Sequence, residues 1–118
     1  MFIFLAALFV AAGLVHGAVK HAGKVERIDL VLVYLLAGYH GIVMVAVALF
    51  GMIHPARAAA MLGAPAGNVF QDFMAWAYLG MSVASILAIW LRGSYLAGPV
   101  VYWSIYFLGA TRVHMSQL

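Results

Sequence analysis

The chain has 118 residues, of which 68% are hydrophobic and 8% are charged. Soluble domains carry about 25% charged residues, and so short a chain cannot bury this much apolar surface in one core, so the composition predicts a single-domain membrane protein. The chain has no cysteine, which excludes disulfides and thiolate metal sites, and its net charge of +3 is too dispersed for a nucleic-acid surface.

Four apolar segments are long enough to cross a bilayer, which takes roughly 20 helical residues. The first is residues 1–19, which lack the basic start of a signal peptide and are therefore expected to be retained. The second span is predicted at 28–52, the third at 73–91 and the fourth at 97–113. A short basic link precedes the second span, and a tight link at Arg92 joins the last two.

The longest polar interruption is residues 54–72, between the second and third spans. Pro55 suits the first turn of a helix because its missing N–H is not needed there, and an alanine-rich sequence follows it. This stretch predicts a short helix at the membrane interface. The predicted fold is therefore an all-α integral membrane four-helix bundle with a short interfacial helix between spans two and three.

Small residues predict where the spans pack closely, because glycine and alanine let two backbones approach. They occur near the end of the first span, in the middle of the second and along the third. The predicted packing residues are Gly13, Gly17, Gly38, Gly41, Gly80 and Ala84.

Lysine and arginine are distributed unequally between the two ends of the predicted bundle. The first and third links contain four of them and the opposite end two: Lys20, Lys24, Arg27 and Arg92 against Arg57 and Arg112. Cytoplasmic loops carry the excess of basic residues, which contact lipid headgroups. We therefore predict a multi-pass protein of the inner (plasma) membrane, with both termini and residues 54–72 outside.

The same topology gathers four polar residues on the outer side, which we call the outer cluster: His54, Gln71, Asp72 and His114. Two imidazoles and a carboxylate can bind a divalent transition metal, and the nearby methionines would favour copper as that metal. The alternative is structural, since His54 can cap the end of span two and Asp72 can pair with an arginine. The sequence leaves both interpretations open.

His40 lies nearest the middle of the bilayer, where a polar side chain is costly without a partner. It could serve as an axial haem ligand or as the relay of a transporter or channel. Haem is not favoured, because no second histidine lies at a similar depth. The structural alternative is a neutral ring that hydrogen-bonds a hydroxyl or carbonyl on a neighbouring helix, such as that of Tyr34, Ser82 or Ser85.

The stretch HPARAAAMLGAPAGNVFQDFMAWAYLG and the later segment SIYFLGATRVHM together resemble one family. The matching features are His54 before a proline, Ala59, Leu62-Gly63, Phe70-Gln71 with Asp72, and later Gly109 and His114. The resemblance covers nearly the whole chain and is to an uncharacterised family of small four-span bacterial and archaeal integral membrane proteins, catalogued as a domain of unknown function. That family places one residue between the glutamine and its acid, whereas here Asp72 follows Gln71 directly. The resemblance implies four spans and points to His54, Gln71 and His114 as residues to test.

The sequence has no phosphate-binding loop, HExxH or GxSxG motif, so an enzyme is not the leading interpretation. We expect first a structural or accessory subunit that packs as a homo-oligomer or beside a larger membrane complex. A metal- or ligand-binding protein that uses the outer cluster is the second hypothesis. A transporter or channel that uses His40 is the third.

Overall fold

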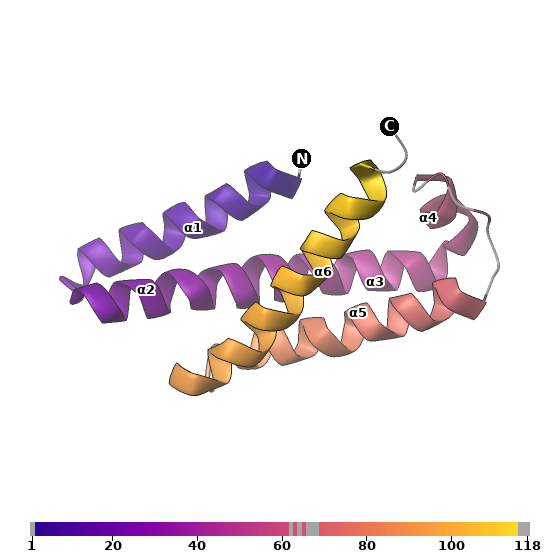
Figure 1. Cartoon of the computed structure of the whole chain (residues 1–118). Helices are drawn as coiled ribbons and strands as arrows, with labels where there is room; N and C mark the ends of the chain where they lie inside the picture. The colour runs from indigo at the N-terminus through magenta and orange to yellow at the C-terminus, as the bar shows by residue number, and fades with distance from the viewer. Residues whose placement is uncertain (1, 62, 64, 66–68, 116–118) are drawn as a thin grey trace.

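The computed structural model describes residues 2–61, 63, 65 and 69–115, with the backbone alone at residues 2, 70, 113 and 114 (Figure 1). Every secondary-structure element in these residues is helical, which confirms the all-α prediction. In chain order the elements are α1 (Phe2–Val19), α2 (Lys24–Val33), the π-helix η1 (Tyr34–Val43), α3 (Met44–Ile53), α4 (Pro55–Met61), α5 (Val69–Leu87), the 3-10 helix η2 (Gly93–Leu96) and α6 (Ala97–Met115).

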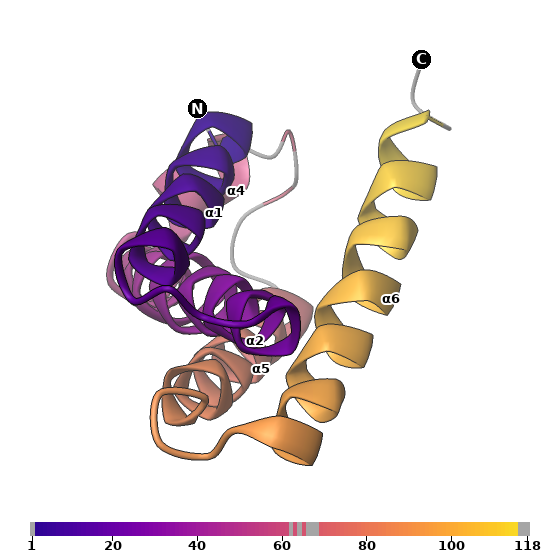
Figure 2. The ribbon, with the colours of Figure 1, turned by 90° about the vertical axis from the view of Figure 1, so that its left-hand side faces the viewer.

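The elements α2, η1 and α3 follow one another without a break and form one helix of 30 residues, Lys24–Ile53, which we call the long helix. It lies between α1 and α5, and α6 crosses the bundle obliquely (Figures 1 and 2). Among the described residues it is the one helix long and apolar enough to cross a membrane, with a mean hydropathy of 2.2 over its most apolar part. The shorter apolar helix Ile3–Val19 packs along its first half.

The long helix begins at Lys24 rather than at residue 28. The turn that precedes residue 28 already has helical hydrogen bonding. The amide of Arg27 donates to the carbonyl of Gly23 over 2.9 Å. Glu26 lies in the first turn, where a carboxylate is stabilised by the helix dipole. The helix therefore includes residues that the sequence placed in the basic link.

The helix α5 runs from Val69 to Leu87 rather than from 73 to 91. After Leu87 the chain forms turns, and Gly93 adopts a φ of +67°, a conformation that glycine adopts readily. The hydroxyl of Tyr95 donates to the carbonyl of Ala84 over 2.8 Å and ties η2 to α5. The link is therefore longer than predicted, and α6 leaves it in a new direction.

Glycines in α1 allow close contact with α2. A Cβ atom at Gly13 would lie 2.8 Å from the Cα of Val31, and one at Gly17 would lie 2.9 Å from the Cγ of Arg27. Real Cβ atoms do not approach other atoms so closely. The two helices can therefore pack at this spacing only with glycine at position 13, whereas a Cβ atom at position 17 would require the Arg27 side chain to shift.

The long helix has glycines facing both of its neighbours. A Cβ atom at Gly38 would overlap the ring of Phe9 in α1, and one at Gly41 would lie 2.6 Å from the Cγ1 of Ile86 in α5. In contrast, a Cβ atom at Gly80 would meet nothing within 4 Å. The five predicted packing glycines thus divide into four at contacts within the chain and one that faces open space, and the sixth predicted residue, Ala84, is partly buried in α5.

The core lies where α6 crosses the long helix. Its buried side chains are Val33, Leu36, Met44, Ala88, Leu96 and Trp103. Trp103 is the largest of them and is 2% exposed. The outward side of α6 is also apolar, since Ile105 and Leu108 are 65% and 72% exposed. The chain therefore has an apolar exterior as well as an apolar core.

Candidate functional site around His40

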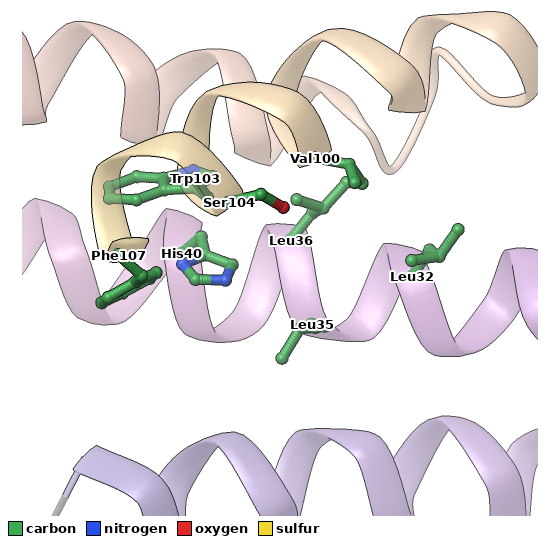
Figure 3. A pocket seen from close by; sticks show the side chains of 8 residues that line it. All are labelled: Leu32, Leu35, Leu36, His40, Val100, Trp103, Ser104 and Phe107. Atoms are coloured by element: carbon green, nitrogen blue, oxygen red, sulfur yellow. The ribbon is translucent and has the colours of Figure 1, made fainter. Parts of the chain in front are cut away.

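His40 lies near the middle of the long helix, inside the π-helix η1, and is 7% exposed. Its ring stacks on the indole of Trp103, with the ring centroids 4.7 Å apart and the planes 17° from parallel (Figure 3). The ring of Phe107, one turn further along α6, has its centroid 5.5 Å from that of His40. Because π-helices are rare and frequently occur at functional sites, we take this region as the candidate site.

Two of the three hydroxyls that were expected to bond His40, those of Tyr34 and Ser85, make other contacts. Tyr34 hydrogen-bonds Nδ1 of His16 over 3.0 Å. Ser85 accepts a hydrogen bond from Nε1 of Trp103 over 2.9 Å and donates to a backbone carbonyl. Within the described residues, neither Nδ1 of His40 nor Oγ of Ser82 has a hydrogen-bond partner. The expected hydroxyl partner is therefore not found at Nδ1, and His40 is positioned by ring stacking instead.

A pocket of about 140 Å³ adjoins His40 between the long helix and α6. Its lining is Leu32, Leu35, Leu36, His40, Val100, Trp103, Ser104 and Phe107 (Figure 3). Pockets for drug-sized ligands are typically about 300–1,000 Å³, so this pocket is smaller than that range. It is an apolar, partly aromatic pocket with one imidazole and one hydroxyl at its wall.

Two buried serines of α5 give a matched test of the hydrogen bond that holds Trp103. Ser85 and Ser82 are both 0% exposed, but only Ser85 bonds Trp103. We expect Ser85→Ala to lower the free energy of unfolding in detergent by about 1 kcal/mol, because it leaves the indole N–H unpaired. Ser82→Ala removes a hydroxyl that has no partner in the described part of the chain and should leave stability unchanged or slightly higher. Equal losses in chemical unfolding of the two variants would contradict this assignment.

The outer cluster is only partly brought together. His54 directly follows the long helix as its C-cap, and its amide donates to the carbonyl of Phe50 over 2.8 Å. Nε2 of Gln71 donates to the carbonyl of Pro55 over 2.6 Å, which joins the two ends of the 54–72 stretch. Asp72 is exposed in the first turn of α5, and the side chain of His114 lies outside the described part of the chain. No group of three metal-ligating His, Asp or Glu residues occurs among the described residues, so the outer site stays a prediction.

The model of a family described as a family of unknown function (DUF6790) matches residues 1–118. The chain belongs to this family. The expectation of an uncharacterised family is thus confirmed over the whole length, including the segments that contain His40 and Trp103. No curated protein and no solved structure matches the chain.

The partner of His40 that the sequence did not reveal is Trp103. A signal was present in the spacing of Val100, Trp103 and Phe107, which places the three side chains on one face of α6. All three line the pocket. The signal was weak because other faces of α6 are equally apolar, so periodicity did not mark one of them as buried.

Proposed function

We propose that this chain is a multi-pass integral membrane protein in which α1, the long helix, α5 and α6 form a four-helix bundle, with α4 at the interface. The long helix supports this proposal, since its 30 residues exceed the roughly 20 that a hydrocarbon core needs. Large apolar side chains are also exposed on the other three helices, with Phe4 at 72%, Trp76 at 66% and Leu108 at 72%. Soluble monomers rarely expose such extensive apolar surface.

The basic links lie at one end of this bundle. A guanidinium nitrogen of Arg92, in the link before α6, is 3.8 Å from a carboxylate oxygen of Asp29 at the start of the long helix. Lys20, Lys24 and Arg27 belong to the same end. We propose that this end faces the cytoplasm, because cytoplasmic loops are rich in Lys and Arg, and that α4 and both termini face outward.

The orientation can be tested with single cysteines because the natural chain contains none. Ala60→Cys in α4 should react with a membrane-impermeant maleimide in intact cells. Gly23→Cys and Ser94→Cys, both exposed positions in the links, should react only after the membrane is permeabilised. The opposite pattern would reverse the orientation, and equal labelling at all three sites in intact cells would contradict the spanning bundle.

Within the membrane, we propose that the chain is a structural or accessory subunit that packs against copies of itself through the outer face of α5. This face is an exposed stripe at helical spacing: Phe73, Trp76, Gly80, Val83 and Leu87. The observation that carries the proposal is Gly80, where a Cβ atom would meet nothing within 4 Å. Because apolar burial does not drive association in lipid, close backbone approach at small residues is a main source of helix affinity.

The test is the mass of the protein in mild detergent, measured by light scattering after size exclusion. The unaltered chain should have a mass greater than that of one copy. The Gly80→Leu variant should have the mass of a monomer, because the leucine side chain prevents close approach of the partner helix. Gly109→Leu is the matched control, since Gly109 is also exposed and has open space around it. An unaltered chain that purifies as a lone monomer without any other protein would contradict the subunit proposal.

A further inference from the structure

Two exposed cations lie side by side at the start of the long helix, where α1 turns into α2 (Figure 1). Lys24 and Arg27 are three residues apart, a spacing that makes two side chains neighbours on a helix. The one ion pair among the described residues joins Arg92 to Asp29 and includes neither of them. Like charges on neighbouring positions repel, so an anion that contacts both side chains would relieve an unfavourable contact.

The guanidinium of Arg27 is held in place by the chain itself. Its Nε donates to the carbonyl of Ala22 over 2.8 Å, and its Cγ lies 2.9 Å from where a Cβ atom of Gly17 would be. Its two terminal nitrogens make no hydrogen bond among the described residues. A guanidinium binds phosphate through two parallel N–H groups, and a fork that is fixed in advance loses less side-chain freedom on binding.

The nearby carboxylate does not cancel these charges. Glu26 lies two residues after Lys24, about 200° around the helix, and therefore projects from the opposite side. It also forms no ion pair with a described residue. With Lys20 in the preceding link, three cations outside any ion pair of the described residues stand against this one carboxylate. This end of the bundle therefore keeps an excess of positive charge.

Apolar side chains are exposed beside the cations. Ile28 follows Lys24 by one turn on the same side of the helix and is 53% exposed. Val19, at the end of α1, is 73% exposed. A free phosphate or an acidic peptide would leave these side chains uncovered. A phospholipid carries its phosphate directly next to acyl chains, so it matches both the charged and the apolar part of this surface.

We propose that Lys24 and Arg27 bind the phosphate of an anionic phospholipid whose acyl chains cover Ile28 and Val19. This inference rests on the proposed membrane bundle and its orientation, since the cytoplasmic leaflet is the one that carries anionic lipids. It does not depend on the proposed oligomer. A zwitterionic lipid such as phosphatidylcholine would bring a second ammonium charge toward cations, so the site should select lipids with a net negative charge.

The test is lipid retention by the purified protein in an uncharged detergent, measured by native mass spectrometry. Phosphatidylglycerol and phosphatidylcholine with the same acyl chains are supplied in equal amounts, and their masses identify the lipid that stays bound. The unaltered chain should retain phosphatidylglycerol with a several-fold preference. Excess glycerol phosphate, which lacks acyl chains, should not displace it. Displacement by glycerol phosphate, or equal retention of the two lipids, would overturn the proposal.

Two variants locate the site. Lys24→Gln changes an exposed side chain and should lower the preference for phosphatidylglycerol by roughly fivefold, the contribution of one basic residue near an anionic lipid. Lys24→Gln/Arg27→Gln should abolish the preference. Because Arg27 also packs at Gly17, circular dichroism checks the fold of the double variant, and the single variant tests the site without altering that contact. An unchanged preference in Lys24→Gln would contradict the assignment.

The matched control removes two positive charges from the opposite end of the chain. Arg57 and Arg112 are both exposed, and Arg57→Gln/Arg112→Gln should keep the preference for phosphatidylglycerol. An equal loss in this control would show an effect of net charge and overturn the site. Cysteine labelling separates this inference from the proposed function: a chain that labels as a spanning bundle but shows no lipid preference would overturn the lipid site alone.

Discussion

Trp103→Ala is expected to lower the free energy of unfolding by about 3 kcal/mol and to release α6 from the long helix. Trp103 is 2% exposed, stacks on His40 and donates a hydrogen bond to Ser85. Truncation of a buried Phe or Trp typically costs about 3–5 kcal/mol. We expect the lower end because, in the proposed membrane bundle, lipid tails would be as apolar as the core and would remove part of the transfer term. Chemical unfolding in detergent, followed by circular dichroism, measures the loss.

The matched control for this prediction is Trp90→Ala. Trp90 has the same side chain but is 69% exposed in the turn after α5. Its replacement should change the free energy of unfolding by less than about 0.5 kcal/mol, as for other exposed sites. A loss at Trp90 as large as the loss at Trp103 would contradict the assignment of the core to the crossing of α6 and the long helix.

Gly13→Ala is expected to destabilise the chain by about 1–3 kcal/mol, the usual cost of overpacking. The new methyl group would lie 2.8 Å from the Cα of Val31, and backbone cannot move aside as a flexible side chain can. The loss should occur although alanine favours a helix over glycine by about 1 kcal/mol. Thermal unfolding in detergent measures the effect, and proximity labelling between α1 and α2 shows whether the helices have separated.

Gly51→Ala is the control for the effect of helix propensity. Gly51 lies in α3, and a Cβ atom there would meet nothing within 4 Å. Alanine should therefore leave stability unchanged or raise it slightly. If Gly13→Ala raised stability as well, the close packing of α1 on α2 would be incorrect.

The sequence predicted the all-helical class and the short helix α4 because these have local signals. Pro55 begins α4, and Gly93 lies in the link before α6. These signals act over a few residues and need no knowledge of the tertiary fold. The ends of the long helix and α5 differed from the prediction by a few residues, and the π-helix η1 and the 3-10 helix η2 were not predicted.

The pairing of helix faces could not be predicted in the same way. A surface helix of a soluble protein is polar on one side, and that polarity shows which side is buried. Here α6 exposes Ile105 and Leu108 and buries Trp103, so both of its sides are apolar. The stacking of His40 on Trp103 depends on which side of α6 faces inward. It could therefore not be predicted from the sequence.

The neighbours of His40 could not be predicted from polarity alone either. Tyr34, Ser82 and Ser85 were reasonable partners by depth, but Tyr34 bonds His16 and Ser85 bonds Trp103. The π-helical hydrogen bonding of η1 has no single-residue signal comparable to a helix cap. The sequence therefore pointed to His40 itself, whereas the groups around it could be identified only from the structure.

The π-helix also sets the rotational phase between the two halves of the long helix. The half before it packs on α1 through Val31, and Gly41 within η1 meets α5 at Ile86. Each residue of an α-helix turns the chain by about 100°, so one residue fewer in η1 would swing α3 around its axis by about that angle. The contacts with α1 and α5 could then not form together. The fold therefore requires a fixed number of residues in η1, whatever side chains those residues carry.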